Sequence, residues 1–206
     1  MDYNDSDVDP VPANTPLRKS ASHGLKIVVV GGFGVGKTTL VGAVSEIPPV
    51  NTEAWMTQAS KTVDPLAESD SKTTTTVAMD FGRVTLARDL RLYLFGTPGQ
   101  PRFWPMWDDL CRGASSAIVL VDTRRLDVSF PAVNYFEHDS SVPFVVAVNL
   151  FGGVLTHPLE QVREALGLVE SVQLLIVDAR SRRSALQALV ASLENTLEKT
   201  SPLLAR

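Results

Sequence analysis

The residues best suited to chemistry lie in the stretch KIVVVGGFGVGKTTLV, residues 26–41. This stretch contains the complete G-x-x-x-x-G-K-T pattern, from Gly31 to Thr38, placed after an apolar run and before a predicted helix. Glycines let the backbone curl so that successive N–H groups point at phosphate oxygens, and the start of the helix adds a partial positive charge. The stretch therefore predicts a loop that binds a nucleoside triphosphate.

The side chains of this loop have separate expected roles. Lys37 is predicted to bridge the β- and γ-phosphates, which makes it a catalytic as well as a binding residue, and the Thr38 hydroxyl is predicted to bind Mg²⁺. The alternative is a glycine-rich turn with an incidental lysine, which the neighbouring strand and helix disfavour. The predicted phosphate-binding residues are Gly31, Gly32, Phe33, Gly34, Val35, Gly36, Lys37, Thr38 and Thr39.

The elements that must position this loop are indicated by apolar runs. Short runs rich in Val, Ile or Leu occur at 25–30, 92–95, 117–121, 144–148 and 172–177. Such runs suit strands covered on both faces, with helical stretches between them. Residues 76–81 alternate apolar and polar and predict one further strand, paired through a turn at 87–90. The expected fold class is α/β: a three-layer P-loop NTPase fold with a mostly parallel six-stranded sheet and helices on both faces.

One domain with tails is the expected organisation of the 206 residues. Residues 1–23 hold few large apolar groups and carry four Asp before Pro10, which predicts a flexible acidic tail. The domain is expected to span 24–200, followed by a C-terminal tail at 201–206. Before residue 76, about 30 residues lack clear periodicity, which is typical of a functional or disordered loop.

Composition excludes several classes of function. With 19 basic against 23 acidic residues the net charge is -4, so no broad basic surface is available and no nucleic-acid partner is expected. Cys111 is the single cysteine, which excludes an intrachain disulfide and fits a reduced cytosolic setting. No apolar run approaches the roughly 20 residues of a membrane span, and no lipidation motif is present. We therefore expect a cytoplasmic protein with no intrinsic membrane anchor.

Three segments resemble the switch regions of Ras-like small GTPases: TVAMDFG (76–82), LYLFGTPGQPRFWPMW (92–107) and CRGASSAIVLVD (111–122). The combination of GGFGVGKTT, TTTTVAMDFG and a proline beside the switch II glycine is more similar to bacterial conservon-type small GTPases, relatives of the Mgl-type polarity GTPases. The resemblance covers about residues 25 to 197. It implies a signalling switch that binds GTP or GDP with Mg²⁺ and hydrolyses GTP slowly.

The same resemblance implies partners and further site residues. The partners would be a roadblock-type regulator and a sensor-kinase-like membrane protein, which would recruit this chain to the membrane. Thr76 would bind Mg²⁺ and close over the γ-phosphate, with Thr73, Thr74 and Thr75 as its rivals. The Gly99 N–H would contact the γ-phosphate, and Gln100 would act catalytically by orienting the attacking water.

The resemblance also assigns the nucleobase contacts. Asn149 matches the first residue of the N-K-x-D motif, and Ala179 with Arg180 matches the loop whose backbone reads the guanine carbonyl. However, Leu150 and Gly152 replace the lysine and the guanine-selecting aspartate of that motif. ATP is therefore not excluded as a ligand.

Two further departures concern hydrolysis. Gly96 replaces the switch II aspartate that steadies Mg²⁺ through water, and Phe33 occupies a position that Ras-like proteins keep small for an activator's arginine. They favour an alternative function: a nucleotide-binding adaptor with little or no hydrolysis and relaxed selectivity between GTP and ATP. A small-molecule P-loop kinase ranks last because neither an acceptor pocket nor an arginine-bearing lid is evident.

Two clusters admit a structural as well as a functional interpretation. The large apolar residues after Gln100 are expected to pack the switch helix on the sheet in at least two cases, and to form a nucleotide-dependent partner surface otherwise. These residues are Phe103, Trp104, Met106 and Trp107. Arg124 and Arg125, beside Asp122, are expected to be solvated charges.

Overall fold

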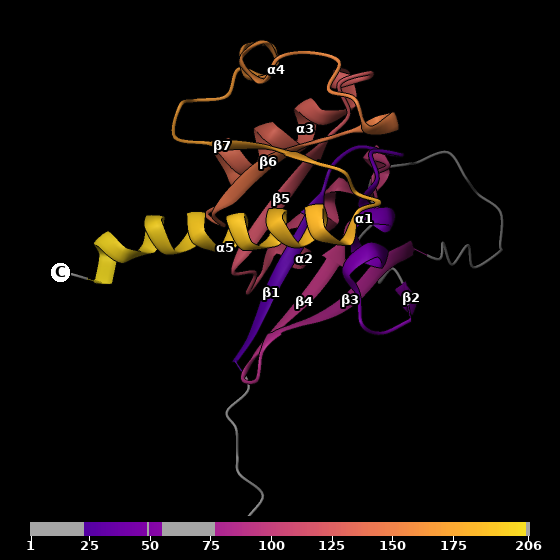
Figure 1. The fold of residues 1–206 in the computed structure, drawn as a ribbon, viewed down its shortest axis with the longest axis vertical. Coiled ribbons are helices and arrows are strands. Elements are labelled where there is room, and N and C mark those ends of the chain that lie inside the picture. The colour runs from indigo at the N-terminus through magenta and orange to yellow at the C-terminus, as the bar shows by residue number, and fades with distance from the viewer. Residues whose placement is uncertain (1–22, 49, 55–76, 205–206) are drawn as a thin grey trace, which may run out of the picture.

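The computed structural model describes residues 23–48, 50–54 and 77–204, and one sheet of seven strands runs through them (Figure 1). The strands are β1 (His23–Val30), β2 (Val50–Ala54), β3 (Val77–Ala87), β4 (Leu90–Gly96), β5 (Ser116–Val121), β6 (Phe144–Asn149) and β7 (Gln173–Val177). The helices are α1 (Lys37–Val44), α2 (Trp107–Cys111), α3 (Phe130–Asn134), α4 (Leu159–Leu166) and α5 (Arg182–Leu204). Shorter helical turns include a 3₁₀ turn at Pro101–Met106 and another at Phe151–Gly153.

The strand order is β2-β3-β4-β1-β5-β6-β7. β1 lies parallel between β4 and β5, and the pairs β5–β6 and β6–β7 are also parallel, whereas β2–β3 and β3–β4 are antiparallel. The predicted α/β class with a mostly parallel sheet is confirmed. The predicted number of six strands is wrong, because β2 comes from the segment without periodicity. Five residues carry too little pattern to reveal an edge strand whose partner lies far along the chain.

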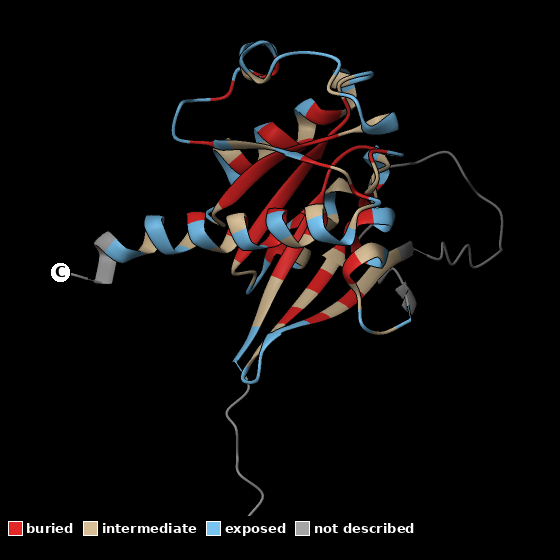
Figure 2. Ribbon diagram, in the orientation of Figure 1, coloured by how far each residue is buried: buried red, intermediate tan, exposed pale blue. Residues whose placement is uncertain are grey.

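Helices cover both faces of the sheet, as predicted. On one face α1 and α5 pack against the strands through residues such as Leu40 and Leu189, which are fully buried. On the other face α2, α3 and α4 enclose a second core that includes Trp107 and Val133. All six residues of β5 and of β6 are buried, which explains their continuous apolar sequences (Figure 2).

The predicted bounds of the domain, 24–200, can be compared with the first and last described elements. Residues 1–22 of the expected tail lie outside the described residues, and His23 already begins β1. α5 continues to Leu204, four residues past the expected end of the domain at 200. Most of the segment expected to be a loop also lies outside the described residues.

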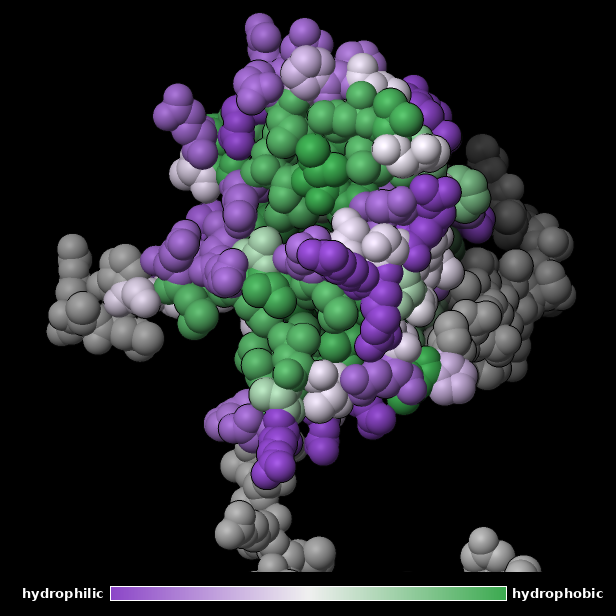
Figure 3. All heavy atoms as spheres, in the orientation of Figure 1, coloured by the Kyte–Doolittle hydropathy of each residue, from purple (hydrophilic) through white to green (hydrophobic). Residues whose placement is uncertain are grey.

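The surface beside α5 includes an apolar edge. Figure 3 shows hydrophobic residues on the face between α4 and α5, where the edge strand β7 runs, and hydrophilic residues along much of α5. Ile176 on β7 and Val190 on α5 are each about two-fifths exposed. Among the described helices, none combines the length and the apolar character that crossing a membrane requires.

Candidate nucleotide-binding site

The loop between β1 and α1 has the curled backbone that the sequence pattern predicts. β1 ends at Val30 and α1 begins at Lys37, so the six residues 31–36 make the whole connection. Gly36 precedes α1 with a φ of 104°, a conformation that side chains disfavour, and its carbonyl accepts the first helical hydrogen bond from Leu40 N at 2.9 Å. A Cβ on Gly31 would lie 2.4 Å from the Leu120 carbonyl oxygen, so only glycine fits there. The glycine spacing is thus imposed by the turn itself.

The Lys37 ammonium lies over this loop. Its Nζ donates hydrogen bonds to the carbonyl oxygens of Gly31 at 2.9 Å and Gly32 at 2.6 Å. The side chain is only 7% exposed, and burial lowers the pKa of Lys37 from 10.5 to about 8, partly offset by the charge of Asp80. A buried cation with neutral acceptors is poised to gain from an anionic ligand such as a phosphate.

The Thr38 hydroxyl donates a hydrogen bond to Oδ2 of Asp80 at 2.7 Å. Asp80 lies on β3, directly opposite Gly96 in the antiparallel pairing with β4. Sequence reasoning missed Asp80 as a site residue, because its relation to Thr38 depends on sheet register. The available signal was a lone acidic residue in the predicted strand TVAMDFG, which precedes the switch II strand.

These groups fit a bound magnesium ion. Mg²⁺ takes oxygen ligands and is held in nucleotide sites by one or two protein groups together with substrate phosphates. The Thr38 hydroxyl and the Asp80 carboxylate supply oxygens of this kind at one place. Within the described residues no group of three or more His, Cys, Asp or Glu side chains could hold a metal by itself.

The segment after β4 lies against the phosphate loop. A Cβ on Gly99 would lie 2.6 Å from the backbone of Gly32 and 2.7 Å from Lys37 Nζ, so the Gly99 backbone is in close contact with both. Gln100 follows, half-buried, and its carbonyl accepts a hydrogen bond from Phe103 N at 3.0 Å at the start of the 3₁₀ turn. The structure thus brings Gly99 beside Lys37, with Gln100 as the next residue along the chain. Thr76, the other predicted metal ligand, lies outside the described residues.

The apolar cluster after Gln100 is largely structural. Phe103 and Trp107 are buried, with 6% and 3% of their surface exposed, which agrees with the expectation that at least two of the four residues pack on the sheet. Trp104 packs partly against the same core, and Met106 is half-buried. A partner surface on this turn stays a prediction.

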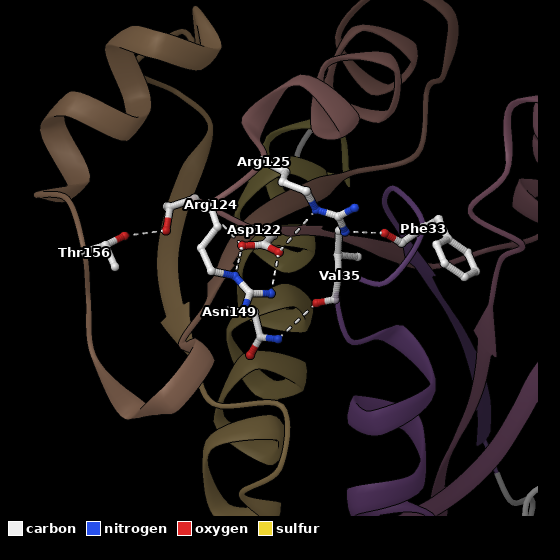
Figure 4. Close-up of polar contacts among 8 residues, drawn as sticks. Phe33, Val35, Asp122, Arg124, Arg125, Asn149 and Thr156 are labelled. Atoms are coloured by element: carbon white, nitrogen blue, oxygen red, sulfur yellow. Dashed lines mark hydrogen bonds and ion pairs between the residues drawn. The ribbon is translucent and has the colours of Figure 1, made fainter.

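Asn149 joins three parts of the predicted site, and its hydrogen bond to Val35 is shown in Figure 4. Its Nδ2 donates to the Val35 carbonyl oxygen at 3.0 Å, and its Oδ1 accepts the backbone N–H of Ala179 at 3.0 Å. Asn149 is 6% exposed and Ala179 is buried. The end of strand β6, the loop 31–36 and the loop after β7 are therefore held together by one amide.

Arg180 follows Ala179 in the sequence and pairs with Asp178. Its Nε and Nη2 donate to the two carboxylate oxygens of Asp178 at 3.0 and 2.9 Å, and these hydrogen bonds hold the pKa of Asp178 below its usual value. The guanidinium is more than half exposed. Pairing with Asp178 therefore holds Arg180 in place next to Ala179.

Arg124 and Arg125 are exposed charges, as the sequence suggested, but both also pair with the buried Asp122 carboxylate. Asp122 is fully buried at the end of β5, and the guanidinium of Arg124 donates to both its oxygens, at 2.9 and 2.8 Å. Burial alone would raise the pKa of Asp122, but these hydrogen bonds hold it below its usual value. Arg125 reaches the phosphate loop, where its Nη2 donates to the Phe33 carbonyl oxygen at 2.9 Å (Figure 4). The buried carboxylate requires these partners, which sequence proximity alone did not reveal.

The turn after Asn149, on the predicted base side of the site, is open to solvent. The Arg124 guanidinium stacks 3.5 Å from the ring centroid of Phe151, in the turn after Asn149. Gly152 follows with a φ of 76°, and nothing lies within 4 Å of where its Cβ would be. At the phosphate loop, the ring of Phe33 is 64% exposed. No side chain of residue 152 is available to read a base.

The arrangement defines a P-loop nucleotide-binding fold. Residues 29–202, most of the chain, match the family model described as conserved hypothetical ATP binding protein. The chain belongs to this family of conserved hypothetical ATP-binding proteins.

Individual similar proteins share limited sequence identity with this chain. An uncharacterized protein of Methanocaldococcus jannaschii is 32% identical over 101 residues, which is 49% of this chain and 53% of the relative. The chain thus spans about half the length of the curated relative that it matches. The G domain of the FeoB iron transporter of T. maritima superposes with a TM-score of 0.56 at 16% identity, covering 85% of this chain and 98% of that one.

The cytosolic domain of the same transporter gives similar values. Its apo form has a TM-score of 0.60 at 15% identity, and a GDP form has 0.59 at 14%. Each covers 84% of this chain and 64% of that chain. Likeness at this level of identity establishes the shared fold.

The buried Lys37 predicts a pH dependence of stability. Between its folded pKa of about 8 and 10.5 the unfolded chain binds more protons, so the free energy of unfolding of the nucleotide-free protein should rise with pH across this window. The difference between the two pKa values corresponds to about 3 kcal/mol. Urea unfolding at about pH 7.5 and about pH 10 should show this rise relative to Lys37→Met, in which it is absent. Parallel curves for the two proteins would show that Lys37 titrates normally.

Proposed function

We propose that this protein is a nucleotide-dependent switch that binds GTP or GDP with Mg²⁺ and hydrolyses GTP slowly. The observation that carries the proposal is the buried Lys37 ammonium, 2.9 and 2.6 Å from two carbonyl oxygens of the curled loop 31–36. Such a loop presents backbone N–H groups and one cation to the phosphates. The metal, when bound, supplies charge neutralisation of the phosphates.

The chain's own groups divide the work. Lys37 would exchange a carbonyl partner for a phosphate oxygen, and Thr38 would present its hydroxyl to the metal. Gln100, the residue after Gly99, would orient the attacking water, and the Gly99 N–H would contact the terminal phosphate. Because Gly99 touches the loop, a terminal phosphate would displace or order residues 96–110, and a partner would read that change.

A second candidate is a nucleotide-binding adaptor with little hydrolysis and relaxed selectivity. The observation that favours it is the open space at Gly152, where Ras-like proteins place the guanine-selecting carboxylate. The family's description as ATP-binding points the same way. The GDP form of the FeoB cytosolic domain shows that a protein of this fold binds a guanine nucleotide. Hydrolysis rate and base preference separate the two candidates.

The cellular setting is proposed from the conservon-type resemblance. On this proposal the protein is cytoplasmic and signals through a roadblock-type regulator and a sensor-kinase-like membrane protein, which would bring it to the membrane. The exposed Phe33 ring supports a regulator that arranges Gln100 instead of inserting an arginine past the loop.

Removing the Lys37 charge should strongly weaken nucleotide binding. Lys37→Met keeps the side-chain volume but removes charge-assisted hydrogen bonds worth about 1.5–3 kcal/mol each, so affinity for a fluorescent GTP analogue should fall at least about tenfold. Lys199→Met, an exposed change on α5, is the matched control and should bind as wild type does. Equal affinity in Lys37→Met and wild type, measured by fluorescence titration, would refute the proposed site.

Hydrolysis should be slow in wild type and slower in Gln100→Leu. The leucine cannot hydrogen-bond the attacking water, so the single-turnover rate should fall by at least about tenfold while nucleotide affinity is retained. Gln187→Leu, exposed on α5, is the control and should leave the rate unchanged. Wild-type turnover that is undetectable, or that Gln100→Leu leaves unaltered, would favour the adaptor.

Base selectivity should sharpen when a carboxylate is placed at residue 152. Gly152→Asp should increase the preference for GTP over ATP about tenfold, or roughly 1.4 kcal/mol, because a carboxylate accepts two hydrogen bonds from guanine. Aspartate tolerates the left-handed backbone better than most residues, and the space is open. Gly153→Asp, with a similar φ of 80° and equally open space, is the matched control. Competition titrations that show equal GTP preference in all three proteins would mean that another residue reads the base.

A further inference from the structure

The carboxylate missing from position 96 has a structural counterpart on the neighbouring strand. Gly96 ends β4, where the resemblance to Ras-like proteins predicts an aspartate, and its antiparallel partner on β3 is Asp80. Residues directly opposite each other in an antiparallel pair lie about 4.5–5.5 Å apart at Cα, and their side chains share one face of the sheet. A carboxylate from residue 80 can therefore reach the region that one from residue 96 would occupy.

A side chain at residue 96 and the Asp80 side chain in its observed place cannot be present together. A Cβ on Gly96 would lie 2.8 Å from Oδ2 and 2.9 Å from Cβ of Asp80. Both separations are shorter than van der Waals contact, so any side chain at residue 96 would displace Asp80. Glycine at 96 is thus the condition under which Asp80 occupies its observed place.

The contact of Asp80 also has the chemistry that a metal site needs. The Thr38 hydroxyl donates a hydrogen bond to Asp80 Oδ2 at 2.7 Å, which leaves the oxygen lone pairs of Thr38 free for a cation. The remaining carboxylate oxygen can accept hydrogen bonds from metal-bound water, as outer carboxylates commonly do. The charge of Asp80 also acts on the Lys37 ammonium, so the carboxylate lies among the phosphate-binding groups.

We propose that Asp80 is the carboxylate that orients Thr38 and steadies Mg²⁺ beside the bound nucleotide, relocated from position 96 to the adjacent strand with Gly96 providing its space. The inference rests on the proposed nucleotide-binding function. Asp80 is a positioning residue that acts through Thr38. Through Asp80, Mg²⁺ would strengthen nucleotide binding even though Gly96 occupies the position of the switch II aspartate.

The test compares nucleotide dissociation in excess Mg²⁺ and in EDTA. Mg²⁺ should slow the release of a fluorescent GDP analogue from wild type by at least about tenfold, and Asp80→Asn should remove most of this effect while leaving the rate in EDTA unchanged. Asp89→Asn, an exposed carboxylate at the far turn of the same hairpin, is the matched control and should behave as wild type.

A reciprocal exchange tests the relocation itself. Gly96→Asp alone should be destabilised, because two carboxylates would compete for one space. Asp80→Gly combined with Gly96→Asp should recover both thermal stability and most of the Mg²⁺ effect, since the carboxylate then comes from β4. Recovery of stability without the Mg²⁺ effect would overturn the proposal.

The remaining outcomes separate this proposal from the function on which it rests. If Asp80→Asn speeds release equally with and without Mg²⁺, Asp80 only supports the loop and the proposal fails. If wild type binds the nucleotide but Mg²⁺ does not slow its release, the proposal fails while nucleotide binding stands. If wild type binds no nucleotide in either condition, the proposed function fails with it.

Discussion

The site depends on the two hydrogen bonds of the buried Asn149 amide. They join Val35, 114 residues away in the sequence, to Ala179, 30 residues away, so the ends of β6 and β7 are held to the phosphate loop. An unpaired amide buried at this position would cost about 1–3 kcal/mol, which ties the conformation of each segment to the other two. The parallel sheet makes the junction possible, because the carboxyl ends of β1, β6 and β7 meet at one edge.

The carboxylates at this edge of the sheet are stabilised by hydrogen-bond partners. Asp122 is fully buried, and two arginines close to it in sequence connect it to the turn at Phe151 and to the phosphate loop. Asp80 is paired in the same sense with the Thr38 hydroxyl. In both cases the hydrogen-bond partners of the carboxylate also contact or belong to the phosphate loop and the start of α1. A change in the charge of a bound ligand would therefore act on the loop and on these carboxylates together.

The sequence predicted the parts of the fold whose signal is local. The phosphate loop follows from glycine spacing, and β5 and β6 follow from apolar runs, because both signals lie within a few consecutive residues. The edge strand β2 and the contact of Asp80 with Thr38 were missed. Each depends on which strands pair and in which register, and that is decided by the whole sheet. The pairing of Arg124 with Asp122 was also not predicted, because an Asp-x-Arg sequence is compatible with either a solvated or a buried carboxylate.

Phosphate binding and base selection rest on different kinds of structure. The phosphate end is made of backbone groups and a lysine held in the interior, so most substitutions there would deform the loop itself. The base end beyond Asn149 is exposed, and its turn carries glycines with open space around them. A side chain can be gained or lost there without cost to the core. On the proposed function, affinity for a triphosphate would be built into the fold, whereas the choice between guanine and adenine would depend on a few exposed residues that can change independently of it.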